Sequence, residues 1–366
     1  MRIIIFGANE TASAIAAEFF EDHDVIVIDS IQKNLELFSR LDVGVICADA
    51  LNIQELKRAE IEDADVFIAC SNDDESNILA CLTSKQISDA QTICFVNKKD
   101  SLDSINYLKD EYKSSYAQCI ESVIWPQRLL VQEIFKIITV PKAVDVENFA
   151  HGRARLLEYR IDEDSELLNK KLKDCCFNSE VLVVGIVRNE ELFIPNGNSE
   201  FLLNDKAILM GTPVGLDIMA GELFEKNEKV KNIGIIGGGT VGFDLAATLE
   251  KTHTKIKLID NNYERCEFLS QELKKTLVLN ASGTSLEILE EEEIGKCDVI
   301  VAITNNDEKN LLCSLLAKQL GAKKVITRVS QDTTVALFER VGVDVAISQR
   351  EACVNEIKNR IIDSRA

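Results

Sequence analysis

Two loops of the chain combine glycines and acidic residues at spacings that suit nucleotide binding. The better preserved loop is Gly237-x-Gly239-x-x-Gly242, which directly follows the apolar segment 233–236. In such a loop the first glycine permits a tight strand-to-helix turn, the second lets the backbone approach phosphate and the third lets the helix pack on the strand. Free N–H groups at the start of the helix then face the phosphate. The loop also contains Gly238, Thr240 and Val241.

A carboxylate ends the next apolar segment, 256–259. Asp260 is placed there to bind ribose hydroxyls, and its negative charge would repel a 2′-phosphate. We therefore predict that this half of the chain binds NAD(H) or an adenine nucleotide such as ATP or ADP in preference to NADP(H). The alternative is a glycine turn that only packs the helix against the strand.

A second and less regular loop lies near the start of the chain. Gly7 is retained, but Asn9 stands at the second glycine position and Ala12 at the third. Asparagine adopts positive φ more readily than most residues, yet its side chain would crowd a pyrophosphate. Asp29 and Asp49 remain suitably placed, so we predict a weaker nucleotide site here. This loop also contains Ala8, Glu10 and Thr11.

A polar motif follows the fourth apolar segment of each copy. Ser71-Asn72 and Thr304-Asn305 are expected at the carboxyl ends of strands, where ligands bind in open α/β sheets. Their hydroxyls are predicted to contact phosphate or ribose. The alternative is helix capping, because acidic residues that suit a first helical turn follow each motif. These acidic residues are Asp73, Asp74 and Asp307.

The two copies differ at positions that would face the ligand. Arg328 ends the fifth apolar segment of the second copy and can neutralise phosphate, whereas Phe95 stands there in the first copy. Asp49 of the first copy corresponds to Ser282 of the second. These differences predict two sites of unequal specificity, with a charged ligand favoured at the second.

Short aliphatic segments alternate with helical segments in both copies, which predicts a parallel, doubly wound sheet in each. Gly7 and Gly237 occupy matching positions, as do Asp29 and Asp260, so a whole domain has been duplicated. We predict an α/β chain with Rossmann-like domains at 1–140 and 229–366 and a small α+β domain at 143–224. A polar linker is expected at 226–229, and no second small domain follows in this sequence. The expected strands are 3–6, 25–28, 43–47, 66–70, 93–96, 119–124, 155–161, 181–188, 191–194, 206–211, 233–236, 256–259, 276–279, 299–303, 325–329 and 345–347.

Composition narrows the class of protein. With 366 residues, 46% of them hydrophobic and 28% charged, the chain predicts a soluble protein of two or three domains. The net charge of −20 argues against binding to nucleic acid or, unaided, to anionic lipid. No apolar run approaches the ~18 residues of a membrane span, and Arg2 and a strand directly after Met1 fit no signal peptide. The 11 cysteines form no C-x-x-C pair and are predicted to be small buried hydrophobes in a reducing cytosol.

The sequence contains few residues suited to catalysis. A nicotinamide dehydrogenase needs an acid or base beside the hydride acceptor, and the chain has 3 histidines. His23 and His253 occupy matching positions before the second strand of each copy, far from the expected crevice, and His151 begins the small domain. No G-x-S-x-G, H-E-x-x-H or Walker A motif is present. We therefore predict a binding protein and not an enzyme, with an NAD-dependent dehydrogenase as the alternative.

The tandem order of domains, the loop 237–242 with Asp260, and the segment 304–310 resemble the RCK or KTN family of potassium-transport regulators. Segments 181–187 and 201–211 resemble the family's C-terminal RCK domain. The resemblance implies two RCK N-type domains with an RCK C-type domain between them, and NAD(H), ATP or ADP bound without turnover. The irregular first loop and the lack of a terminal RCK C-type domain depart from the family pattern.

The resemblance also implies a role and partners. Nucleotide exchange would move the Rossmann lobes, and a homo-oligomer, dimer to tetramer, would transmit the movement to an integral-membrane potassium-translocating subunit. The protein would then be cytoplasmic and peripherally attached to the membrane through that partner. Control of another cation channel or exporter is an alternative, as is a scaffold with vestigial pockets.

The predicted helix 126–138 bears on assembly, because one of its faces is apolar and needs a partner surface. That face covers its own sheet edge or, by the resemblance, crosses between lobes. The face consists of Leu129, Leu130, Ile134, Phe135 and Ile138.

Overall fold

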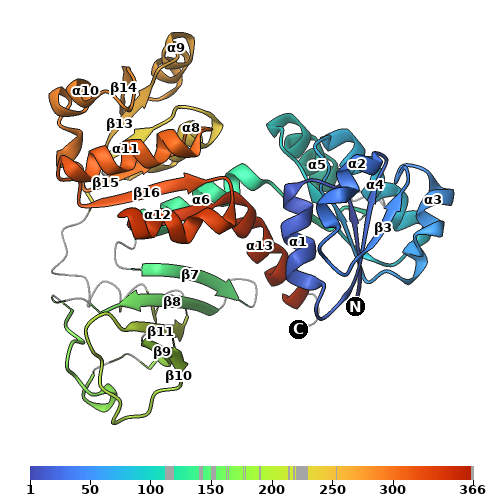
Figure 1. Cartoon of the computed structure of the whole chain (residues 1–366), viewed down its shortest axis with the longest axis horizontal. Coiled ribbons are helices and arrows are strands. Elements are labelled where there is room, and N and C mark those ends of the chain that lie inside the picture. The colour runs from blue at the N-terminus through green and yellow to red at the C-terminus, as the bar shows by residue number, and fades with distance from the viewer. Residues whose placement is uncertain are drawn as a thin grey trace. The chain divides into compact units, whose positions relative to one another are not determined.

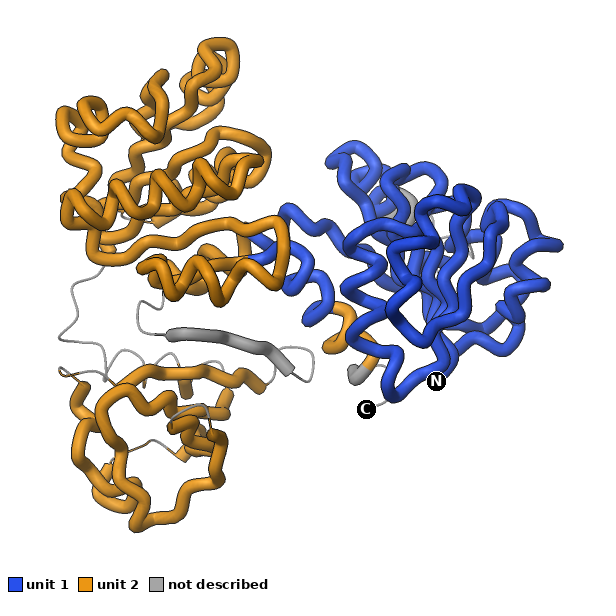
Figure 2. Tube along the Cα trace, viewed as in Figure 1, with its two compact units in different colours: residues 1–130, 348–356 blue, residues 131–347, 357–366 orange. Residues whose placement is uncertain are grey.

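The computed structural model describes residues 1–363 except for 112–118, 140–142, 150–153, 162, 164, 176, 178, 189–190, 213–214, 217–218, 220–229 and 253. The expected linker 226–229 and the histidines His151 and His253 lie outside the described residues. The chain forms two compact units, one of residues 1–130 with 348–356 and one of residues 131–347 with 357–366 (Figure 2). Within the described residues, no helix has both the length and the apolar character to cross a bilayer.

The first unit, drawn mainly in blue and teal in Figure 1, is built around a sheet flanked by helices. This sheet has six parallel strands in the order β3-β2-β1-β4-β5-β6. This is the Rossmann order, which reverses between β1 and β4 and leaves the ligand crevice at the carboxyl ends of these strands. The strands are β1 (Arg2–Phe6), β2 (Asp24–Asp29), β3 (Gly44–Cys47), β4 (Val66–Ala69), β5 (Gln91–Phe95) and β6 (Ser122–Ile124). All six were predicted, although β6 is shorter than the segment 119–124.

Helices cover both faces of this sheet, so its central strands are apolar throughout: Ile3, Ile4 and Ile5 are all fully buried. The helices are α1 (Glu10–Phe19), α2 (Gln32–Leu35), α3 (Ile53–Arg58), α4 (Asp74–Ile87), α5 (Lys99–Glu111) and the start of α6 (Pro126–Thr139). The first half of α13 (Gln349–Asp363) also belongs to this unit. The compact units therefore differ from the sequence domains at residues 131–140 and 348–356.

The small domain is a five-stranded antiparallel sheet with the order β10-β9-β11-β8-β7. Its strands are β7 (Ala143–Phe149), β8 (Ala154–Arg160), β9 (Val181–Arg188), β10 (Glu191–Phe193) and β11 (Lys206–Gly211). Four of them were predicted, whereas the edge strand β7 was not. Tyr159, Phe201 and Leu209 are fully buried in its core.

The second Rossmann sheet has the order β14-β13-β12-β15-β16-β17, which is the order of the first sheet and confirms the duplication. Its strands are β12 (Asn232–Ile236), β13 (Lys255–Asp260), β14 (Thr276–Asn280), β15 (Val299–Ala302), β16 (Lys324–Val329) and β17 (Val345–Ser348). Its helices are α8 (Thr240–Leu249), α9 (Tyr263–Glu272), α10 (Leu286–Glu291), α11 (Asp307–Gln319) and α12 (Val335–Val341).

The apolar face of α6 is largely covered within the chain. Leu130, Ile134 and Ile138 are buried, and Leu129 and Phe135 are half-buried. Residues 131–139 belong to the second unit. There the Nζ of Lys324 on β16 lies 3.5 Å from the carbonyl oxygen of Ile137.

Candidate functional site

The glycines of the second loop meet different structural demands. Gly237 has φ of +113°, where only glycine is unstrained, and its N–H donates to the carbonyl oxygen of Ile259 at 2.9 Å. A Cβ on Gly242 would lie 1.9 Å from the carbonyl oxygen of Gly237, so α8 approaches the loop only because that side chain is absent. A Cβ on Gly239, by contrast, would meet no described atom within 4 Å. Packing therefore does not require Gly239, which borders open space.

The start of α8 offers backbone N–H groups to an anion. Gly239 is the N-cap residue of α8 and has no side chain to cap it. The first N–H groups of a helix have no partner within the helix, and the helix dipole is positive at this end. The N–H groups of Thr240, Val241 and Gly242 are thus suited to bind phosphate.

The first loop is closed by its own side chain. Gly7 has φ of +97°, and a Cβ there would lie 2.5 Å from the backbone of Ser71. Asn9 caps α1, because its Oδ1 accepts the N–H of Ala12 at 2.9 Å. The Nδ2 of Asn9 donates to the carbonyl oxygen of Cys70 at 2.6 Å and so ties the loop to the end of β4. A phosphate would have to displace this side chain.

The residues after Asn9 also differ from those of the second loop. Glu10 places a carboxylate in the first turn of α1, where the second copy has Thr240. This carboxylate forms an ion pair with Arg350 of α13, within the same unit. Thr11 follows in the same turn and is half-buried.

The two aspartates that end the second strands brace their own loops. Oδ2 of Asp260 accepts the N–H of Gly238 at 2.7 Å, and Oδ1 accepts the N–H of Asn262 at 2.8 Å. Oδ2 of Asp29 accepts the N–H of Ala8 at 2.7 Å in the same way. Each carboxylate oxygen has further lone pairs, so a ribose hydroxyl can still donate to it.

The hydroxyls of the polar motif bond within the protein. The N–H and Oγ1 of Thr304 both donate to Oδ1 of the buried Asn310, at 2.8 and 2.6 Å. Ser71 makes the same pair of bonds to Asn77, at 2.8 and 2.7 Å. In this arrangement each hydroxyl can accept a bond from ribose but has no proton to offer phosphate. Neighbouring Asn72 is exposed, and its Oδ1 lies 3.4 Å from Nδ2 of Asn9.

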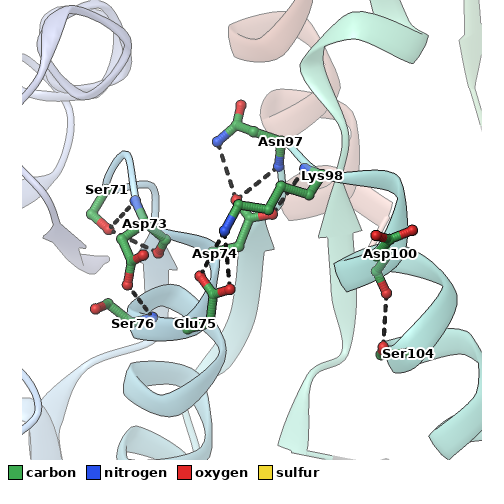
Figure 3. Close-up of polar contacts among 9 residues, drawn as sticks. All are labelled: Ser71, Asp73, Asp74, Glu75, Ser76, Asn97, Lys98, Asp100 and Ser104. Atoms are coloured by element: carbon green, nitrogen blue, oxygen red, sulfur yellow. Dashed lines mark hydrogen bonds and ion pairs between the residues drawn. The ribbon is translucent and has the colours of Figure 1, made fainter.

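The acidic residues after the first motif organise α4 (Figure 3). Asp73 caps the helix by accepting the N–H of Ser76 at 2.9 Å, which confirms the capping prediction for this residue. Hydrogen bonds from Ser76 lower the pKa of Asp73. The fully buried Asp74 accepts the N–H groups of Asn97 and Lys98, each at 2.9 Å, and so joins α4 to the loop after β5.

Arg328 supplies positive charge at the second crevice. It is half-buried, and its Nη1 donates to Oδ1 of Asn305 at 3.2 Å. Burial lowers the pKa of Arg328, and the carboxylate of Asp307 partly opposes this shift. Within the described part of the chain, no carboxylate oxygen lies within 4.0 Å of the guanidinium nitrogens of Arg328, the limit for an ion pair. The matching Phe95 is buried and uncharged, so this cation belongs to the second crevice.

Asp49 and Ser282 lie in turns that follow the third strands. Oδ1 of Asp49 accepts the N–H of Leu51 at 3.0 Å. The hydroxyl oxygens of Ser282 and Thr284 are 2.9 Å apart. The two turns thus differ in charge at equivalent places.

Arg265 was not selected in the sequence analysis, yet it contacts the second loop directly. Its Nε donates to the carbonyl oxygen of Gly238 at 2.6 Å, and its Nη2 donates to that of Gly239 at 3.2 Å. Its guanidinium carbon lies 4.7 Å from the ring centroid of Phe268 and 5.8 Å from that of Phe243. The side chain reaches the loop from α9, 26 residues away in sequence.

Comparison with known families agrees with this architecture. The TrkA-N domain model matches residues 3–111 and 233–349, and the TrkA-C domain model matches residues 156–219. The chain belongs to the TrkA family. The predicted resemblance to RCK-type regulators is thereby confirmed, including the N-type, C-type, N-type order of the domains.

Similarity over nearly the whole of this chain extends to several TrkA proteins. The Trk system potassium uptake protein trkA homolog 1 of Methanosarcina mazei is 37% identical over 371 residues, covering 98% of this chain and 88% of that protein. The Archaeoglobus fulgidus homolog is 36% identical over 98% of this chain and 80% of its own length. TrkA of Halomonas elongata is 30% identical over 99% of this chain and 79% of its own length.

Solved structures share the TrkA-type fold at low sequence identity. The GsuK RCK domain superposes on the whole of this chain and 77% of its own, with a TM-score of 0.72 and 18% identity. The GsuK channel bound to NAD superposes on all of this chain and 64% of its own, with a TM-score of 0.73 and 17% identity.

Proposed function

We propose that this TrkA-family chain is a nucleotide-sensing regulatory subunit that controls potassium uptake. The second crevice carries the proposal: it combines the uncapped start of α8 at Gly239, the cation of Arg328 and the carboxylate of Asp260. These groups suit the pyrophosphate and ribose of NAD(H), with ATP or ADP as further candidates. The relatives' names as potassium uptake proteins support the transport role, and the GsuK structures bound to NAD and to ADP support the ligand class.

The proposed activity is binding without turnover, so the chain is not an enzyme in this account. Its crevice side chains already bond within the protein: Thr304 donates to Asn310, and Asp260 accepts backbone N–H groups. His23 stacks on Phe19 with ring centroids 5.7 Å apart and precedes β2, at the strand's amino end. A regulatory switch needs ligand affinities that differ between two arrangements of the protein and does not need a catalytic group.

Calorimetry on the full chain tests the ligand assignment. NAD, NADH, ATP and ADP are titrated one at a time, and we expect at least one to bind, more tightly at the second crevice than at the first. Absence of binding by all four would support a vestigial scaffold instead. A parallel assay follows NADH absorbance with small carbonyl compounds, and steady consumption would revive the dehydrogenase alternative.

The membrane partner in this proposal is an integral-membrane potassium-translocating subunit, which would hold the protein at the cytoplasmic face of the membrane. Deleting the gene should then slow growth at low external potassium, and high potassium should restore it. Control of another cation channel or exporter is the second candidate. Normal potassium uptake by the deletion strain at every concentration would exclude the first candidate in favour of the second.

We further propose that the chain forms a homo-oligomer, dimer to tetramer. The outward face of the small-domain sheet carries exposed apolar side chains, among them Leu182, Leu192 and Met210, which are 65%, 65% and 38% exposed. Leu182 and Met210 are paired across β9 and β11. A contiguous apolar face of this kind suits a second copy of the same sheet. Light scattering should show at least a dimer, and a wild-type monomer at all concentrations would contradict this.

A further inference from the structure

We infer that Arg265 positions the phosphate-binding loop of the second crevice by holding the carbonyl groups of Gly238 and Gly239. The inference rests on the proposed function, because it concerns how that crevice presents donors to a nucleotide phosphate. The two contacts are the hydrogen bonds from Nε to Gly238, at 2.6 Å, and from Nη2 to Gly239, at 3.2 Å.

The effect of these bonds follows from peptide geometry. In a trans peptide the carbonyl and the N–H point in opposite directions, and the chain has no cis peptide among its described residues. Fixing the carbonyl of Gly238 therefore fixes the N–H of Gly239, and fixing the carbonyl of Gly239 fixes the N–H of Thr240. Both N–H groups then point away from Arg265. The N–H of Thr240 is one of the α8 donors that suit a phosphate, and the N–H of Gly239 adds a further donor one residue before it.

Gly238 is held from both sides. Its N–H donates to Oδ2 of Asp260 at 2.7 Å, while its carbonyl accepts from Arg265. Asn262 connects Asp260 and Arg265, since its N–H donates to Asp260 and its Oδ1 accepts the N–H of Arg265 at 2.8 Å. The loop is therefore preorganised by the first turn of α9.

The guanidinium is itself restrained. It lies over the rings of Phe268 and Phe243, whose centroids are 5.6 Å apart. Cations stack favourably on aromatic faces. Such stacking keeps the planar guanidinium of Arg265 oriented towards the carbonyl oxygens of Gly238 and Gly239. A lysine has no planar fork and donates from a single point.

Among the residues described for it, the first copy has no arginine that holds its glycine loop in this way. Asn34 stands at the position equivalent to Arg265, and its Nδ2 donates to Oδ1 of Asp29 at 3.2 Å and not to the glycine loop. Asn9 fixes that loop from within. Arg265 therefore accounts for a second difference between the crevices, in addition to Arg328.

The test compares Arg265→Gln and Arg265→Lys with the wild-type full chain. Arg340→Gln is the matched control, because it removes an exposed arginine from the same Rossmann domain. We measure affinity for ADP by calorimetry and affinity for adenosine by competition. Hydrogen exchange of the peptide 232–249, with and without ADP, reports the loop donors directly, and the peptide 2–19 serves as an internal reference.

Both Arg265 variants should bind ADP about tenfold more weakly, which corresponds to about 1.4 kcal/mol, while adenosine affinity and the melting temperature stay near wild type. ADP should no longer protect residues 239–240 from exchange. Full ADP affinity in Arg265→Lys would show that charge alone matters, and an equal loss of adenosine affinity would show general structural support. Either result overturns the inference. If the wild-type chain binds none of ADP, ATP, NAD and NADH, the result counts instead against the proposed function.

Discussion

Oδ1 of Asn9 accepts a 2.9 Å hydrogen bond from the N–H of Ala12, and this bond closes the first phosphate loop. The matching N-cap residue of the second loop is Gly239, which has no side chain to make such a bond. In the first loop the side chain of Asn9 already accepts the N–H of Ala12, whereas in the second loop no N-cap side chain competes with a ligand for the backbone donors. The two crevices are therefore expected to differ in their affinity for phosphate.

Replacing Asn9 with glycine should open the first crevice. Glycine is a tolerable N-cap residue, but the Asn9→Gly variant also loses the hydrogen bond from Nδ2 to the carbonyl oxygen of Cys70, so it should lose about 1–2 kcal/mol of stability. Nucleotide affinity at the first crevice should rise, with new ligand-dependent protection from exchange in the peptide 2–19. Asn52→Gly changes the N-cap of α3 and serves as the control. Unchanged affinity in Asn9→Gly would show that this side chain does not limit binding.

Removal of the carboxylate at the end of β13 should weaken the second site. Asp260→Ala loses both the predicted bond to ribose and the brace on Gly238. We expect nucleotide affinity to fall by roughly 1.5–3 kcal/mol, the range for a hydrogen bond to a charged group. Calorimetry measures the loss, and Asp29→Ala provides the matched change in the first copy. The ribose assignment fails if Asp260→Ala binds as tightly as the wild type.

Lys324 should make stability depend on pH in the alkaline range. Burial lowers the pKa of Lys324 to about 8 from 10.5. Between these values the unfolded chain holds a proton that the folded chain has lost, so stability rises with pH across this window. At pH 7 the burial of the charge costs the folded state up to about 3 kcal/mol.

The Lys324→Met variant should therefore be about 1–3 kcal/mol more stable than the wild type near pH 7, with the difference shrinking towards pH 10.5. Denaturant unfolding at several pH values measures it. Lys323→Met, which changes an exposed neighbour paired with Asp298, should leave the rise in stability between pH 8 and pH 10.5 unchanged. A stability difference that does not vary with pH would contradict the assigned pKa.

The cysteines should differ sharply in reactivity. Eight of the ten described cysteines are buried, which confirms the prediction for most of them, but Cys47 is exposed and Cys175 is half-buried. Burial raises the pKa of Cys297 and of Cys313 to about 11, and that of Cys353 to about 12. At pH 8 these thiols are protonated and unreactive. Mass spectrometry after alkylation should find Cys47 modified first, and rapid native labelling of Cys353 would contradict the packing.

Periodicity and glycine spacing predicted most of the fold. Continuous apolar runs such as residues 3–5 are typical of strands buried on both faces, so both Rossmann sheets could be placed from the sequence. The edge strand β7 could not, because its segment 143–149 mixes three polar residues with four apolar ones and its pairing with β8 depends on tertiary context.

The candidate site was predicted in part. Asp29 and Asp260 lie beside their loops as expected, since the order of strand, loop and helix fixes that position. Sequence could not show that Thr304 would donate its hydroxyl proton to Asn310, because both partners were equally able to face a ligand. Arg265 was missed for the same reason, although comparison with Asn34 of the first copy would have singled it out.

Potassium uptake by a deletion strain that carries either the wild-type chain or Gly239→Val tests the central claim most directly. Gly239 has φ of −61°, and a Cβ there would meet no described atom within 4 Å, so valine should leave the fold intact while blocking phosphate. Gly242→Val is the control for loss of folding, because its side chain would collide with the loop backbone. We predict that folded Gly239→Val fails to restore uptake at low potassium although the wild-type chain does. Normal uptake with Gly239→Val would show that nucleotide binding at the second crevice does not control transport.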